Sequence, residues 1–135
     1  MTNFICGLNL KFDVIGISET WMKENSPVVQ IPNYSFLCKG RQSKAGGSVG
    51  LYVKSDLDFT IRDNLSIDQP VCDSLFVEIR QKHGKNIIIG VFYRAPNLDS
   101  RNFLTAFDSI LDRLSQEKKM VTSWVTLTLI FYNML

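Results

Sequence analysis

Short hydrophobic runs, several of them alternating with polar residues, fill most of the chain up to residue 93. Residues 13–18 (DVIGIS) form a continuous apolar run, which is typical of a strand buried on both faces. Residues 74–80 alternate cleanly, with Leu75, Val77 and Ile79 on one face, and a turn with a glycine joins them to the apolar run 87–93. The two runs predict a β-hairpin. Further strands are predicted over residues 34–39, 49–54 and 58–63, the last as a continuation or partner of 49–54.

The period changes after residue 98, where one strong amphipathic helix is predicted. Asp99 or Ser100 can cap its first amide groups, and Lys118 and Lys119 suit the negative end of its dipole. Its apolar stripe is Phe103, Phe107, Ile110, Leu111 and Leu114. A weaker helical pattern covers residues 3–11. This order of elements predicts an α+β or α/β fold with a largely antiparallel sheet.

Composition excludes several classes of protein. The chain has 135 residues, 45% of them hydrophobic, and a net charge of +2, so it can bury a core but has no strongly basic balance for holding nucleic acid. Cys6, Cys38 and Cys72 match no zinc or disulfide spacing, and we expect a reducing, intracellular compartment, cytoplasmic or nuclear. No leader peptide and no membrane span is predicted. His83 is the sole histidine, which excludes a histidine pair.

Three stretches are candidates for chemistry. Glu19 follows the predicted strand 13–18, where it is either a solvated acid capped by Ser18 or a ligand for a hard cation such as Mg²⁺. The glycine-rich stretch 45–50 precedes a strand rather than a helix, so we expect a turn or bulge there and no phosphate cradle. In residues 92–97 (FYRAPN), Tyr93, Arg94 and Asn97 together suit a phosphodiester, although such residues at a strand end also serve in packing.

Several segments together resemble a known family. They are DVIGISETWM, IPNYSFLCKGRQSKAGGSVGLYVK, SLFVEI, NIIIGVFYRAPN and FLTAFDSILDRLSQEKK. In order and spacing they resemble the endonuclease domain of non-LTR (LINE-type) retrotransposons, a member of the endonuclease/exonuclease/phosphatase superfamily. The resemblance covers about residues 8–119.

The resemblance implies a partial β-sandwich (α/β-sandwich) flanked by helices, with the active site at one end of the sandwich. It implies that Glu19 binds the Mg²⁺ ion and that Tyr93 meets the scissile phosphate. Asn97 would lie close by, and Arg94 would contact the DNA backbone. Ala95 stands where the family usually has proline. The implied reaction is hydrolysis of a DNA phosphodiester by an activated water.

Other parts of the family pattern do not occur in this sequence. The family's first strand with its asparagine, the GDFN motif after the helix and the closing Asp-His pair are all missing, so we expect a domain truncated at both ends. We therefore divide the chain into a partial endonuclease domain, 1–119, and a divergent apolar tail, 120–135. If the coding sequence is read from the third base of the Trp124 codon, codons that are compatible with the observed residues can encode Gly-Asp-Phe-Asn. One hypothesis is therefore that the tail is translated out of frame. A real strand rich in β-branched residues is another, and the two are compatible.

We therefore expect a fragment of a Mg²⁺-dependent DNA endonuclease that is inactive as this chain, with weak metal binding and weak or lost DNA binding. Self-association through uncovered sheet edges is expected. Two alternatives stay open. A non-catalytic fragment would bind nucleic acid through Lys39, Arg41, Lys44 and Arg94, and a structural remnant would bury its open edge against a second chain.

Overall fold

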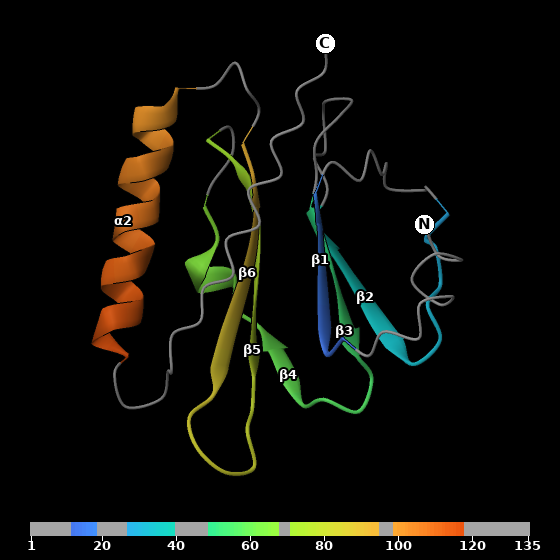
Figure 1. The fold of residues 1–135 in the computed structure, drawn as a ribbon. Helices are drawn as coiled ribbons and strands as arrows, with labels where there is room; N and C mark the ends of the chain where they lie inside the picture. Colours follow the sequence, from blue (N-terminus) through green and yellow to red (C-terminus); the bar gives the residue numbers. More distant parts are fainter. Residues whose placement is uncertain (1–11, 19–26, 40–48, 68–70, 95–98, 118–135) are drawn as a thin grey trace.

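The computed structural model describes residues 12–18, 27–39, 49–67, 71–94 and 99–117. The predicted helix at 3–11 and the tail 120–135 lie outside these ranges. The described elements are β1 (Val14–Ser18), β2 (Tyr34–Lys39), β3 (Val49–Lys54), β4 (Phe59–Ile61), the 3₁₀ turn η1 (Asp63–Leu65), β5 (Asp73–Ile79), β6 (Ile87–Tyr93) and α2 (Ser100–Gln116) (Figure 1).

The strands form two antiparallel sheets, and α2 covers one of them. The first sheet has the order β1-β3-β2 and the second has the order β4-β5-β6. Figure 1 shows three layers, with α2 beside the second sheet and the first sheet on that sheet's other face. The predicted mixed α+β class with antiparallel pairing is confirmed, with two small sheets in place of one.

Apolar side chains fill both spaces between the layers. Between the sheets, a buried cluster joins β3 to β5 and β6; its members are Val49, Leu51, Val53, Leu75, Val77 and Val91. Between the second sheet and α2, Phe76 and Phe92 meet the helix residues Phe103, Ile110 and Leu114. Because side chains alternate across a strand, β5 and β6 contribute to both clusters. The β5–β6 hairpin of the second sheet is therefore buried on both faces.

The start of α2 and most of its apolar stripe follow the sequence pattern. The Asp99 carboxylate accepts a hydrogen bond from the Arg101 backbone N–H at 2.9 Å, so Asp99 is the N-cap, as predicted. Phe103, Ile110 and Leu114 are buried. Leu111 was wrongly assigned to the stripe, because its side chain is 40% exposed. It lies on the flank of the stripe, where the helix surface has already turned away from the sheet.

Two predictions about strand placement were wrong. β1 was expected to be buried on both faces, but it is an edge strand of the first sheet within the described residues, and its residues are half-buried or exposed. An apolar run indicates burial without giving the strand order. The run at 58–63 does not pair with β3. A turn closed by the Leu57 N–H and the Lys54 carbonyl redirects the chain, and Phe59–Ile61 pairs with β5 in the second sheet.

The β5–β6 hairpin is confirmed, in a register that runs from Asp73 opposite Tyr93 to Ile79 opposite Ile87. Its close packing depends on Gly90. A Cβ atom at this position would lie 2.5 Å from the Phe76 ring, which is itself buried on the helix-facing side. The ring therefore occupies the space that a larger residue at 90 would need.

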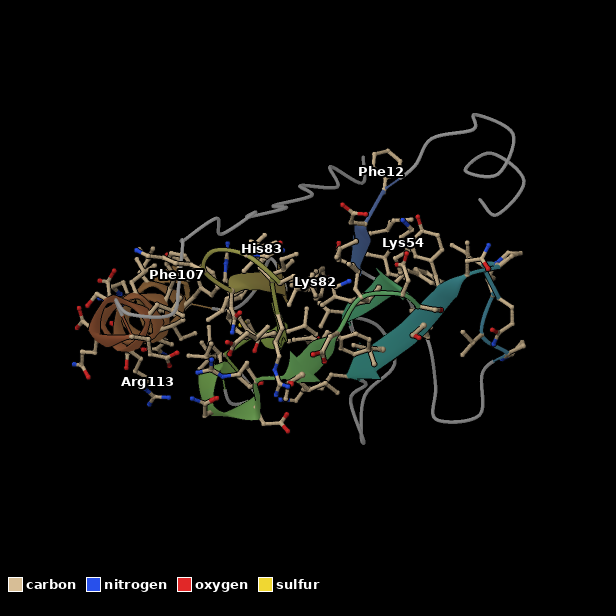
Figure 2. The ribbon with its side chains drawn as sticks, turned by 90° about the horizontal axis from the view of Figure 1, so that it is seen from below. Phe12, Lys54, Lys82, His83, Phe107 and Arg113 are labelled. Atoms are coloured by element: carbon tan, nitrogen blue, oxygen red, sulfur yellow. The ribbon has the colours of Figure 1, made fainter. Side chains whose placement is uncertain are left out.

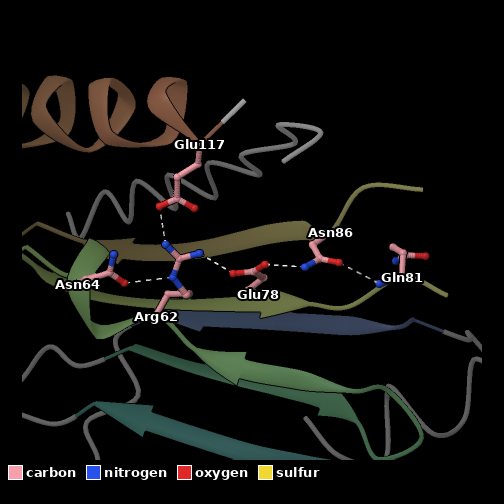
Figure 3. A network of polar contacts seen from close by, with 6 residues as sticks. All are labelled: Arg62, Asn64, Glu78, Gln81, Asn86 and Glu117. Atoms are coloured by element: carbon pink, nitrogen blue, oxygen red, sulfur yellow. Dashed lines mark hydrogen bonds and ion pairs between the residues drawn. The ribbon is translucent and has the colours of Figure 1, made fainter. Parts of the chain in front are cut away.

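A chain of polar contacts fixes the C-terminal end of α2 to the second sheet (Figure 3). The Arg62 guanidinium donates to the carboxylates of Glu78 on β5 and Glu117 at the end of α2. Asn86 donates to the other oxygen of Glu78 at 2.7 Å. On the same flank of α2, Arg113 donates to the Asn64 carbonyl at 2.7 Å. The side chains of Arg62 and Glu78 are only 15% and 13% exposed, so this pair is well shielded from water.

The pKa of Glu78 shows which effect dominates in this network. Burial raises the pKa, but hydrogen bonds from Asn86 and Arg62 and the charges of Arg62 and Arg80 outweigh it, so the net pKa is lowered. The pKa of Arg62 is raised, chiefly by its hydrogen bond to Glu117, against the opposing effect of burial. The charged form of each group is therefore favoured in the folded protein.

The Gly90→Ala substitution should destabilise the protein by about 1–3 kcal/mol, because the new methyl group must displace the Phe76 ring. Urea unfolding followed by circular dichroism measures this loss. Gly16→Ala is the matched control in another strand, since a Cβ there would make ordinary contacts at 3.7 Å. Equal effects of the two substitutions would contradict the packing argument.

Replacing Arg62 by Met should lower the free energy of unfolding by about 2–3 kcal/mol, because two partly buried carboxylates lose their partner. Arg80→Met is the control. Its pair with Asp58 is 3.6 Å long and both side chains are more than 60% exposed, so a change within about 0.5 kcal/mol is expected. A loss at Arg62 no larger than that at Arg80 would show that the network adds little.

Stability should fall as the pH drops below the ordinary Glu78 pKa of 4.5. A carboxyl group whose pKa is lower in the folded state stabilises the fold above its unfolded pKa, and this contribution is lost as the pH falls through the folded value. In Glu78→Gln this part of the pH dependence should disappear, and stability at pH 7 should be lower. Free energies of unfolding measured from pH 7 to pH 3 test this. Parallel profiles for the wild type and Glu78→Gln would count against it.

Candidate functional site

The two candidate site residues that the structure describes, Tyr93 and Arg94, lie at one end of the layered molecule. β1, β2 and β6 all end there, and β3, β5 and α2 begin there, at the top of Figure 1. We call this the Tyr93 end and define it by Ser18, Lys39, Val49, Asp73 and Tyr93. Ser18 and Lys39 both pair with Val49 across the first sheet, and Asp73 pairs with Tyr93 across the second.

β1 and β6 face each other across the space between the sheets and run in the same direction (Figure 1). A Cβ atom on Gly16 would lie 3.7 Å from the Val91 side chain, so Gly16 of β1 lies opposite Val91 of β6. Two residues further on, β1 reaches Ser18 and β6 reaches Tyr93. The residue that precedes Glu19 therefore lies at the same end of the molecule as Tyr93.

Tyr93 is half-buried and packs against the apolar cluster between the sheets. Arg94 follows it and is also half-buried. Glu19 and Asn97, the other two predicted site residues, lie outside the described residues. Of the four predicted site residues, the described part of the chain thus contains Tyr93 and Arg94. They lie at the end of β6, the strand predicted over residues 87–93.

The glycine-rich stretch at 45–50 is described only for Val49 and Gly50. Gly50 lies within β3 rather than in a turn, and a Cβ there would come within 2.8 Å of the Phe36 ring. Here the small residue permits a close approach of an aromatic ring to the backbone. The expected turn or bulge would fall on residues outside the described ranges.

Sequence reasoning missed Asp73. Its side chain is 2% exposed, and it is the one buried charged residue in the described part of the chain. Strand alternation places it on the face shared by Leu75 and Val77, directly across from Tyr93. An ionised carboxylate in such a place needs hydrogen bonds or an opposite charge to offset its lost hydration. The signal was an acid at an inward position of the alternating run 73–79.

The described residues do not by themselves make up a magnesium site. Across these ranges there is no group of three or more His, Cys, Asp and Glu side chains that could hold a metal ion. Asp73 is the buried acid among the described residues at the Tyr93 end, and Mg²⁺ is usually anchored by one or two carboxylates together with substrate phosphate. Glu19, the expected ligand, cannot be placed against it. We therefore derive no catalytic step through a metal.

The opposite end of the molecule carries a basic turn. Lys82 and His83 project from the β5–β6 hairpin, as Figure 2 shows from below, and both are exposed. His83 is a turn residue, as expected.

No helix among the described elements is long and apolar enough to cross a membrane.

Comparison of the chain with protein-family models, curated proteins and solved structures finds no match. The family resemblance therefore rests on the sequence segments quoted above.

Proposed function

We propose that this chain is a fragment of a retrotransposon-type, Mg²⁺-dependent DNA endonuclease of the endonuclease/exonuclease/phosphatase superfamily, and that it has little or no nicking activity by itself. The proposal includes the finer fold, a partial β-sandwich of that superfamily. Its support is the order of the sequence segments together with the two packed antiparallel sheets and the helix on the outer face of one of them.

One observation carries the proposal. β1 and β6 run side by side in the same direction, so their last residues, Ser18 and Tyr93, lie at the same end of the molecule. A cation-binding acid directly after Ser18 and a phenol at residue 93 could then meet the same phosphodiester. Opposite ends for these two residues would have made a joint site impossible.

Inactivity follows from the groups that such a reaction needs. Phosphodiester hydrolysis requires a group that activates the water and groups that stabilise the charge of the transition state. In the proposed family these come from the GDFN motif and the Asp-His pair, and neither occurs in this sequence. Glu19 and Tyr93 would then bind a phosphate without cutting it.

A plasmid-nicking assay with Mg²⁺ tests the proposal. The wild-type chain and Glu19→Ala should both leave supercoiled plasmid intact at the background rate, because the water-activating groups are missing. Nicking by the wild type that Glu19→Ala abolishes would overturn the predicted inactivity. Isothermal titration with Mg²⁺ in the presence of a short DNA duplex supplies the second readout: weak binding lost in Glu19→Ala supports the proposed site, and equal titrations of the two proteins contradict it.

A second candidate function is non-catalytic binding of nucleic acid. Lys39 lies at the Tyr93 end and is exposed, and Arg94 directly follows Tyr93 in the sequence. Two cations at one end suit a phosphate backbone. A steep fall of DNA affinity with salt, reduced by Lys39→Ala and Arg94→Ala but not by Lys82→Ala at the opposite end, would favour this function. Salt-independent binding would exclude it.

A further inference from the structure

The tip of the β5–β6 hairpin is a protruding, positively charged turn. We define the basic turn as residues 80–85, all of which are exposed. In Figure 1 it extends beyond the other described elements at the lower end of the molecule, and Figure 2 shows Lys82 and His83 on it. Residues 79–94 contain no Asp or Glu. Outside the turn, no stretch of six residues in the described ranges carries more than one Lys or Arg.

Two cations of the basic turn have no acidic partner. Arg80 pairs with Asp58 at 3.6 Å. Lys82 and Lys85, in contrast, form no ion pair with any residue that the structure describes. Glu78, the acid that precedes the turn, already accepts hydrogen bonds from other residues. An anion placed between the two lysines would therefore gain attraction from both.

The base of the turn is fixed by hydrogen bonds. The Arg80 backbone N–H donates to the Asp58 carbonyl at 2.9 Å. The Gln81 N–H donates to the side-chain oxygen of Asn86 at 3.3 Å, and Asn86 itself donates to Glu78 at 2.7 Å. The turn is thus tied both to the start of β4 and to the buried polar network. Binding of an anion at its tip would therefore order little additional backbone.

The backbone at the tip is open to solvent. Gly84 has a φ angle of 100°, and a Cβ atom added to it would meet nothing within 4 Å. The N–H groups of residues 82–85 make no hydrogen bond to the part of the chain that the structure describes. Backbone N–H groups in a turn bind oxyanions, and lysine adds a compact positive charge. A small anion can thus reach both kinds of group.

We propose that the basic turn binds a terminal phosphate group, free or as a monoester, through Lys82 and Lys85. Such a group carries about two negative charges above pH 7, whereas each phosphodiester of DNA carries one. The turn has no aromatic or large apolar side chain, and those are the usual anchors of protein partners and of stacked bases. Because the turn lies at the end opposite Tyr93, the inference does not depend on the proposed function.

The test is an NMR titration of the full chain at pH 8 and constant ionic strength. Inorganic phosphate should shift the amide signals of residues 81–85 with saturation in the millimolar range, because exposed charges bind weakly in water. Dimethyl phosphate, a diester with one charge, should bind at least about fivefold more weakly. Phosphoserine and a nucleoside 5′-monophosphate separate the sources. Equal affinities assign the site to the phosphate group alone, and tighter binding of one compound identifies the molecule that carries it.

A pair of double variants isolates the two lysines. Lys82→Ala/Lys85→Ala should weaken phosphate binding by roughly fivefold or more. Because both side chains are exposed, this variant keeps the fold. Lys54→Ala/Arg101→Ala is the matched control, since it also removes two cations, each of which has an acidic partner. Its affinity should stay within about twofold of the wild type.

Three outcomes would overturn the proposal. Equal shifts with phosphate and dimethyl phosphate would show general screening of charge rather than binding of a terminal phosphate. Equal losses in the two double variants would show that the basic turn has no special part in binding. Tighter binding of a glutamate oligopeptide at the same amide groups would assign the turn to an acidic protein segment instead.

Discussion

Burial of the β5–β6 hairpin on both faces is the constraint on which the rest of the fold depends. The hairpin presents Phe76 and Phe92 to one side and Leu75 and Val91 to the other. Each face needs its own apolar cover, since exposing either would cost the hydrophobic free energy of several large side chains. α2 supplies one cover and β3 of the first sheet supplies the other. The three layers are the consequence of a hairpin whose two faces are both mainly apolar.

The sequence predicts the elements better than their partners. Periodicity located β2, β3, the hairpin and α2 with its cap at Asp99, because hydrophobic periodicity and helix capping depend on residues that are close together in the sequence. It did not predict that the chain crosses from one sheet to the other between β3 and β4. That step depends on a turn at residues 54–57 and on long-range pairing with β5. The edge position of β1 was missed for the same reason.

The buried polar contacts also could not be predicted from a local sequence pattern. The alternation predicted for residues 74–80 puts Glu78 on the face opposite Leu75 and Val77, and the structure agrees with that alternation. Its partner Arg62 is 16 residues away and the second carboxylate of the network, Glu117, is 55 residues from Arg62. No spacing rule connects such residues. For the candidate site, the order of segments suggested Tyr93 and Arg94, whereas Asp73 became visible only when its burial was known.

Stability and the candidate chemistry belong to different ends of the molecule. Arg62 and Glu117 meet near the end of α2, whereas Tyr93 lies where α2 begins (Figures 1 and 3). The alignment of β1 with β6 follows from apolar packing, with Val91 seated against Gly16. It requires no catalytic group. Under the proposed function, the alignment of Ser18 and Tyr93 would therefore not depend on the groups that activate water, because Gly16 and Val91 pack against each other without them.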